Sequence, residues 1–324
     1  GSISEYDAAT DKFLFADGAP GKAVNQEKLI KDLVEAATSG NYDAVIQAEV
    51  NESQPELSAA NAKEQYKTLS TFTTETTANE KRNTNVKLAA QYCDGTILMP
   101  GESFSYNLGV GELTEERGFL PGPSYADGQS VMDMGGGICQ VSSTMYMACL
   151  YANLEIDERH CHPYPSSYVP AGLDATVAWD GCDFVFTNDT DYPIKVSTSY
   201  DGYSTSCTIW GTITEPFSVE LYTETVETEP YETKYELDKS LGKDEQVLDT
   251  VGIEGLTVQS YRRVYDGDGN VISDNPEAIS VYSKRDEVYK VGKLPKDKDK
   301  DKDKDQNKDK SDSSDTDKKT TESE

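Results

Sequence analysis

The chain has 324 residues, a length typical of two or three domains, and its 36% hydrophobic content is enough for buried cores. It carries 30 Lys and Arg against 59 Asp and Glu, and the resulting net charge of −29 argues against nucleic acid or an anionic membrane surface as a partner. No apolar stretch reaches the length of a membrane-spanning helix. Because Gly1-Ser2 resembles the scar of a cleaved tag, we expect the native N-terminus to be missing, and with it a membrane anchor.

Residues 1–67 predict a small α+β unit. Asn25 is a candidate N-cap, because apolar residues recur at helical spacing from Leu29 onwards. The apolar residues 44–50 then predict a strand, and residues 59–69 predict a second helix. Helix and strand therefore alternate in this short region.

Residues 68–214 mix helical and extended patterns. We expect Asn83 or Thr84 to cap a helix that ends near Gly95. Residues 109–137 are rich in glycine and irregular in period, which indicates a long loop of the kind that carries function. The other features expected here are a threonine-rich transition over residues 71–77, a helix after Cys139, an extended segment over 159–179, a hairpin over 185–196 and a strand over 203–210.

After residue 216 the pattern changes to long strands separated by glycine turns. Residues 217–293 therefore predict an all-β module. Residues 294–324 hold 9 Lys and 11 acidic residues and almost no apolar side chain, which predicts a disordered tail. The fold class we expect for the whole chain is α+β, with a mixed central domain, a small α+β unit before it and the all-β module after it.

A glycine run that leads into a cysteine, Gly135-Gly136-Gly137-Ile138-Cys139, is the most informative local motif. The apolar segment that follows it predicts a helix, so Cys139 would lie at the positive end of a helix dipole. That position lowers the pKa of a thiol and favours the nucleophilic thiolate. The alternative is that Cys139 is a small buried residue packed beneath a tight turn.

The chain has two histidines, His160 and His162, two positions apart in an extended segment, so both side chains should project from the same face. A cysteine nucleophile needs a base within hydrogen-bond reach and a third group that orients the base. Asp174 and Tyr168 are candidates for this third group. A competing interpretation takes both histidines and Cys139 as three ligands of a zinc ion with one open position.

Six motifs follow one another as they do in the VanW family of Gram-positive cell-envelope proteins, which the chain resembles. The motifs are Arg82-Asn83-Thr84-Asn85-Val86, Pro100-Gly101-Glu102-Ser103-Phe104-Ser105-Tyr106-Asn107, Gly135-Gly136-Gly137-Ile138-Cys139-Gln140-Val141-Ser142-Ser143-Thr144, Glu158-Arg159-His160-Cys161-His162, Tyr168-Val169-Pro170-Ala171-Gly172-Leu173-Asp174-Ala175-Thr176-Val177 and Phe186-Thr187-Asn188.

The resemblance to VanW covers residues 68–214. Residues 1–67 resemble, more weakly, part of the peptidoglycan-binding domain that often precedes VanW. Residues 217–293, with Gly242, Gly252 and Gly255, look like a G5 domain, a β module linked to adhesion to wall polymers. The resemblance implies an extracytoplasmic protein, held in the cell wall or by a membrane anchor on the outer face of the cell.

VanW domains are associated with L,D-transpeptidase activity, which forms 3→3 cross-links in peptidoglycan. For this chain the resemblance implies that Cys139 forms a thioester with a stem tetrapeptide, that His162 is the base, and that Asp174 orients it. No cofactor is implied, and the partners are stem peptides and, through the G5-like module, a wall polymer. The groups expected around the substrate and its oxyanion are Gly136, Gly137, Gln140, Arg159, His160 and Tyr168.

Two functions of other classes stay open at this point. In the first, the protein binds the cell wall without catalysis, and the glycine-rich loop only packs. In the second, it is a cysteine peptidase or carboxypeptidase that hydrolyses the same stem peptides, with water in place of the acceptor amine.

Overall fold

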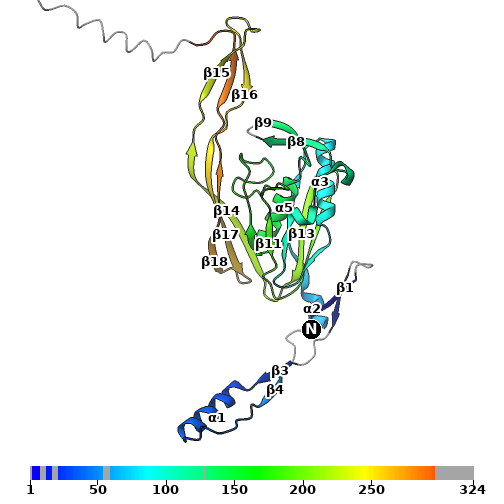
Figure 1. Cartoon of the computed structure of the whole chain (residues 1–324), viewed down its shortest axis with the longest axis vertical. Helices are drawn as coiled ribbons and strands as arrows, with labels where there is room; N and C mark the ends of the chain where they lie inside the picture. Colours follow the sequence, from blue (N-terminus) through cyan, green and yellow to red (C-terminus); the bar gives the residue numbers. More distant parts are fainter. Residues whose placement is uncertain (1, 8–11, 17–20, 54–58, 127–128, 296–324) are drawn as a thin grey trace, which may run out of the picture. The chain divides into compact units, whose positions relative to one another are not determined.

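The computed structural model describes residues 2–7, 12–16, 21–53, 59–126 and 129–295. These described residues divide between two compact units, one within residues 1–228 and 255–283 and the other within residues 229–254 and 284–295. Helices and strands mix throughout the first unit, which confirms the α+β class (Figure 1). No helix among the described residues is long and apolar enough to cross a membrane. The predicted disordered tail lies, from residue 296 on, outside the described residues.

The N-terminal region contains two small strand pairs and two helices. Asn25 caps the first helix by accepting a hydrogen bond from the Lys28 N–H, as predicted. The strand predicted over residues 44–50 is wrong, because only Val50 belongs to a strand. The elements are β1 (Ser2–Asp7) paired with β2 (Lys12–Ala16), β3 (Gly21–Val24) paired with β4 (Val50–Ser53), α1 (Gln26–Thr38) and α2 (Ala59–Gln65).

A four-stranded antiparallel sheet with two helices packed on it forms the centre of the first unit (Figure 1). The helix α3 contacts β12 and β13, whereas α5 contacts β5 and β13, and the two helices also contact each other. Their apolar side chains form a large part of the core. The strands, in spatial order, are β5 (Tyr66–Glu75), β13 (Ser204–Thr212), β12 (Ile194–Tyr200) and β6 (Thr96–Leu98), and the helices are α3 (Glu80–Cys93) and α5 (Cys139–Tyr151).

The threonine-rich segment expected as a transition is the strand β5. Its alternation places Thr71 and Thr73 on the outer face, where they pair with hydroxyls of β13. Ser70 and Thr74 point inwards and bond α5 at the Ala148 carbonyl (2.6 Å) and the Thr144 hydroxyl (2.8 Å). Threonine is well suited to a strand, and these hydroxyls fix the helix on the sheet.

Short strands and a hairpin surround this core. The loop expected over residues 109–137 contains a short helical turn and the β8–β9 hairpin. The hairpin predicted over residues 185–196 is wrong, because β11 pairs with β7 and β10 whereas β12 pairs with β13 and β6. The elements are β7 (Ser103–Ser105), α4 (Tyr106–Val110), η1 (Glu115–Arg117), β8 (Pro121–Ala126), β9 (Gln129–Met134), β10 (Glu155–Glu158) and β11 (Val185–Thr187).

The C-terminal region is all-β, as predicted. Three strands form one sheet, in the order β14 (Phe217–Glu229), β17 (Gly255–Asp266) and β18 (Val271–Tyr282), and belong almost entirely to the first unit. The strands β17 and β18 pair in antiparallel fashion. The second unit contains a separate sheet in the order β15 (Thr233–Leu237), β19 (Glu287–Val291) and β16 (Gln246–Thr250).

Candidate active site

The helix α5 begins at Cys139, as the glycine run predicts. No side chain caps this helix start. The N–H of Gln140 bonds the Gly137 carbonyl (3.1 Å), whereas within the described part of the chain the N–H groups of Gly137 and Cys139 have no hydrogen-bond partner. Free N–H groups beside a thiol at a helix start suit a developing oxyanion. The N–H groups of Gly137 and Cys139 are therefore available as donors, whereas the Gln140 N–H is already bonded.

The glycines before Cys139 pack tightly against the protein itself. A Cβ on Gly136 would lie 2.6 Å from the carbonyl carbon of Gly122 and closer still to its oxygen. Gly137 has a φ of +112°, and a Cβ there would lie 2.6 Å from Cγ of Arg82. Glycine tolerates both the positive φ and the close approach. Internal packing thus explains why positions 136 and 137 are glycine. A contact of Gly136 or Gly137 with substrate remains a prediction.

Gly136→Ala should lower the free energy of unfolding by about 1–3 kcal/mol, because the new methyl group overlaps the Gly122 carbonyl. Gly181→Ala is the matched control, since its Cβ would lie 3.4 Å from that of Ala178 in ordinary contact. Urea denaturation of both variants measures the difference. Equal stabilities would show that the Gly122–Gly136 contact is not tight.

Side chains from α3 and α4 hold the glycine turn in place. Asn85 donates to the carbonyls of Leu120 (2.8 Å) and Gly136 (3.0 Å) and accepts from the Leu120 N–H. The Tyr106 hydroxyl donates to the Ile138 carbonyl at 3.0 Å. Both side chains are buried. Neither was predicted as a site residue, because their only signal was membership of a motif far from Cys139.

Two chain segments lie beside α5 and carry the other site residues. The Ser143 hydroxyl, on α5, accepts from the Ala175 N–H at 2.9 Å. The Thr176 N–H donates to the His160 carbonyl at 2.8 Å, which joins the two segments by one β-bridge. These bonds place residues 160–162 and 174–177 side by side next to Cys139.

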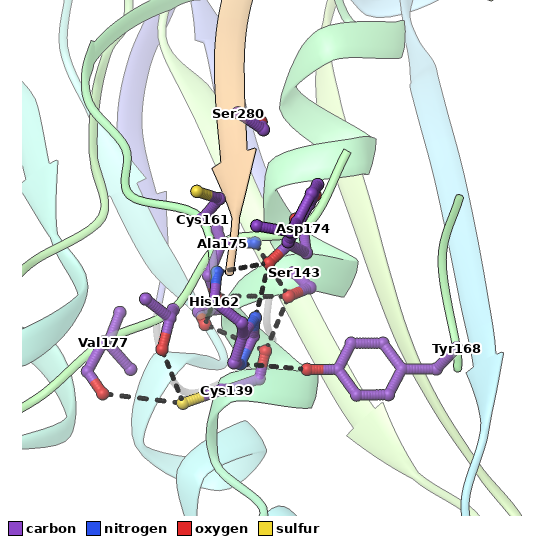
Figure 2. A network of polar contacts seen from close by, with 12 residues as sticks. Cys139, Ser143, Cys161, His162, Tyr168, Asp174, Ala175, Val177 and Ser280 are labelled. Atoms are coloured by element: carbon purple, nitrogen blue, oxygen red, sulfur yellow. Dashed lines mark hydrogen bonds and ion pairs between the residues drawn. The ribbon is translucent and has the colours of Figure 1, made fainter. Parts of the chain in front are cut away.

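Cys139, His162 and Asp174 form a catalytic-triad arrangement (Figure 2). Nδ1 of His162 lies 2.5 Å from Oδ2 of Asp174, and the His162 N–H donates to the same oxygen at 2.7 Å. In Figure 2 the imidazole lies between this carboxylate and the side chain of Cys139. Sγ of Cys139 is also 3.6 Å from the Thr176 hydroxyl. The orienting bond at Nδ1 leaves Nε2 for proton transfer.

The pKa values of the pair shift in opposite directions. Burial raises the pKa of the Cys139 thiol, but the hydrogen bond and positive charge of His162, together with the bonds to Val177 and Thr176, outweigh burial, so the pKa is lowered. Burial lowers the pKa of His162, but the hydrogen bond to Asp174 and the interaction with Cys139 raise it to about 9. A lowered thiol pKa beside a raised imidazole pKa favours a thiolate–imidazolium pair near neutral pH.

Asp174 is almost completely buried, with a side-chain exposure of 1%, and donors surround it. Arg159, itself 4% exposed, lies 3.1 Å from Oδ1 of Asp174 through Nη2, and the Tyr282 hydroxyl donates to Oδ1 at 2.5 Å. Burial raises the pKa of Asp174, but its bonds with His162 and Tyr282 lower it overall. The carboxylate is therefore held ionised and fixed in orientation.

The remaining predicted site residues divide into two groups. Tyr168 is close to the triad, with its hydroxyl 3.4 Å from Nε2 of His162. Arg159 faces Asp174 instead of open space, and the buried Gln140 side chain bonds Arg82 and Thr74. His160 is 49% exposed and pairs with Glu158.

The two histidines have different partners, because His160 is exposed and bonds Glu158 whereas His162 bonds the buried Asp174. His160 therefore does not join Cys139 and His162, and the three-ligand set required by the zinc interpretation is not assembled. Among the described residues, no three His, Cys, Asp or Glu side chains are placed to hold a metal ion.

Two family models match consecutive parts of the chain. Residues 81–210 match the model described as VanW like protein, and residues 222–293 match the G5 domain. G5 domains occur in cell-surface and secreted proteins. Among solved structures, the crystal structure of HP0197-G5 is 23% identical, with 24% of this chain and 99% of that chain covered and a TM-score of 0.15. The IgA1 protease G5 domain is 12% identical, with coverages of 25% and 95% and a TM-score of 0.18.

Two relatives match the VanW region. YoaR of Bacillus subtilis is 39% identical over 133 residues, which are 41% of this chain and 44% of YoaR. The vancomycin B-type resistance protein VanW of Enterococcus faecalis is 32% identical over 127 residues, which are 38% of this chain and 46% of that protein. The matches thus span less than half the length of either relative. The chain consists in large part of a VanW domain followed by a G5 domain, and it is homologous to VanW and YoaR.

Proposed function

We propose that the protein is a cysteine acyltransferase, and specifically a peptidoglycan L,D-transpeptidase. The observation that carries the proposal is the Cys139–His162–Asp174 arrangement, with a lowered thiol pKa and a raised imidazole pKa. The N–H groups of Gly137 and Cys139 have no hydrogen-bond partner within the described residues, and they would form an oxyanion site at the same helix start.

The substrate class rests on the family. The resemblance to VanW domains implies stem tetrapeptides of peptidoglycan as donors, and a G5 domain is suited to hold the enzyme near a wall polymer. The proposed location is the outer face of a Gram-positive cell. The net charge of −29 on the whole chain is consistent with a partner other than nucleic acid.

In the first half-reaction, the Cys139 thiolate attacks the carbonyl carbon between the third residue, a diamino acid, and the terminal D-Ala. The C–S bond forms, and the carbonyl oxygen becomes an oxyanion that the Gly137 and Cys139 N–H groups stabilise. The C–N bond then breaks, and the His162 imidazolium donates its Nε2 proton to the leaving amine of D-Ala. The products are free D-Ala, a thioester and neutral His162.

In the second half-reaction, the side-chain amine of a second stem attacks the thioester. His162 accepts a proton from this amine through Nε2, and the new C–N bond replaces the C–S bond. The Cys139 thiolate leaves and the imidazolium is restored, so the cycle needs no cofactor. Asp174 keeps the imidazole in the required orientation through both steps.

The experiment is to incubate the protein with disaccharide-tetrapeptides and to analyse the products and the intact protein by mass spectrometry. We expect a cross-linked dimer, released D-Ala and a covalent adduct on Cys139. Cys139→Ala should form none of them. Cys182→Ala is the matched control, because Cys182 is a free, half-buried cysteine. Its backbone carbonyl, which the substitution keeps, accepts from the Ala178 N–H.

The other two functions give different products. Release of D-Ala without a dimer would identify a hydrolase that uses the same thioester. Wild-type protein that forms no product and no adduct would contradict catalysis on these peptides and favour a wall-binding role.

A further inference from the structure

The strands β17 and β18 lie within the G5-matching residues yet belong to the same compact unit as the VanW region. Unit 1 contains residues 255–283, which include the whole of β17 and β18. The G5 match is therefore divided, because residues 229–254 and 284–293 belong to the second unit.

Strand β18 and the residue that follows it, Ser283, contact the triad segment at several points. The Ser283 N–H donates to the Pro163 carbonyl at 2.8 Å, directly after His162. Ser280 accepts from Nη1 of Arg159 at 2.7 Å, and the strand that carries it passes beside the network in Figure 2. Both Ser280 and Tyr282 are buried. Docked strands of this kind leave little room for movement of the segment they cover.

Tyr282 makes the contact that matters most for the site. Its hydroxyl donates to Oδ1 of Asp174 at 2.5 Å and accepts from the Gly172 N–H at 2.6 Å. The same Oδ1 is held by Arg159, while Oδ2 faces His162. Gly172 has a φ of +93°, and a Cβ there would lie 2.8 Å from a methyl group of Val258 on β17. The sheet thus fits closely against the loop that presents Asp174.

We propose that strand β18 of the G5-matching region completes the active site, with Tyr282 as a positioning residue that fixes the carboxylate of Asp174. The module is then part of the catalytic machinery as well as a tether to a wall polymer. This inference extends the proposed function, since it assigns a residue to the same triad, but it concerns the reactivity of Cys139 and can be tested without a substrate.

The test compares Tyr282→Phe with wild type by the rate of iodoacetamide alkylation of the Cys139 peptide from pH 4 to pH 10, followed by mass spectrometry. Loss of the hydroxyl removes a donor from the ionised carboxylate, so the pKa of Asp174 rises and the imidazolium supports the thiolate less well. We expect the acid limb of the profile to move about half a unit to higher pH, with a rate about threefold lower on that limb.

Tyr261→Phe is the matched control, because its hydroxyl lies on the same sheet but bonds the exposed Glu224. If Tyr282→Phe does not fold, Ser280→Ala loosens Arg159 at the same carboxylate and should shift the limb in the same direction. If Tyr282→Phe folds and its alkylation profile matches that of wild type, the inference is wrong. If Tyr282→Phe does not fold, an unshifted profile in Ser280→Ala overturns the inference in the same way.

The two proposals fail in distinguishable ways. A shifted alkylation profile without any turnover of tetrapeptides would contradict the proposed substrate and leave the role of Tyr282 intact. Dimer formation by wild type with an unshifted Tyr282→Phe profile would contradict only the role of Tyr282.

Discussion

Replacing Asp174 with Asn should lower the free energy of unfolding at pH 6 by about 3–5 kcal/mol, the usual result of breaking a buried ion pair on one side. Arg159 and Asp174 are 4% and 1% exposed, so the variant leaves a buried guanidinium without its counter-charge. The carboxylate also accepts from the Tyr282 hydroxyl and from two nitrogens of His162. An amide offers one acceptor oxygen, so at least one of these donors would face its NH₂ group.

The difference in stability between wild type and Asp174→Asn should become smaller at low pH and also at high pH. The pKa of Asp174 is lowered from 3.8, so its charge stabilises the folded state above about pH 4, and the contribution is lost as the pH falls. The pKa of His162 is raised from 6.5 to about 9, partly by Asp174, so that contribution is complete below pH 6.5 and is lost as the pH rises towards 9. The difference between wild type and variant should be largest between these limits.

Acyl transfer by Asp174→Asn should fall by about 10²–10⁴-fold, because the imidazole loses the group that sets its tautomer and orientation. Urea denaturation at pH 3, 6 and 9 and the dimer assay measure the two effects. Asp157→Asn is the matched control, since Asp157 is exposed and its carboxylate accepts from the Thr187 hydroxyl. A stability difference that does not change with pH would contradict the charge argument.

The helix at Cys139 and two partners of the site could be predicted because their signals are local or chemical. A glycine run before an apolar segment predicts a helix start, and the thiol's need for a base points to one of two histidines in the chain. Asp174 was one of two candidates for the orienting group, and the structure places it 2.5 Å from His162. The all-β nature of residues 217–293 followed from strand periodicity in the same way.

The parts that could not be predicted depend on contacts between distant residues. Tyr282 reaches Asp174 across 108 positions, and no local pattern marks it. The three-residue strands β7 and β11 are too short for periodicity to reveal their pairing. The different partners of His160 and His162, which are Glu158 and Asp174, depend on tertiary contacts, and alternation along a strand says nothing about them.

His162→Ala should slow alkylation of Cys139 at pH 6.5 by at least about 10-fold. Without the imidazolium, the pKa of the thiol loses the hydrogen bond and the positive charge of His162 that lower it. Burial still raises this pKa and only the bonds with Val177 and Thr176 still lower it, so the thiolate fraction at pH 6.5 falls. A more basic thiolate is also a better nucleophile, so the alkylation rate falls by only about half as much, on a logarithmic scale, as the thiolate fraction does. His160→Ala is the matched control and should alkylate at the wild-type rate, because His160 is exposed and pairs with Glu158.

Acyl transfer should fall by about 10²–10⁴-fold in His162→Ala, since the general acid and base is lost. Wild-type transfer and alkylation should also separate at high pH. As the pH rises above about 9, His162 loses the proton that the leaving amine requires, so transfer declines. The thiolate persists there, so alkylation continues undiminished. Transfer that continues undiminished above pH 9, like alkylation, would show that His162 supports the thiolate but does not donate the proton.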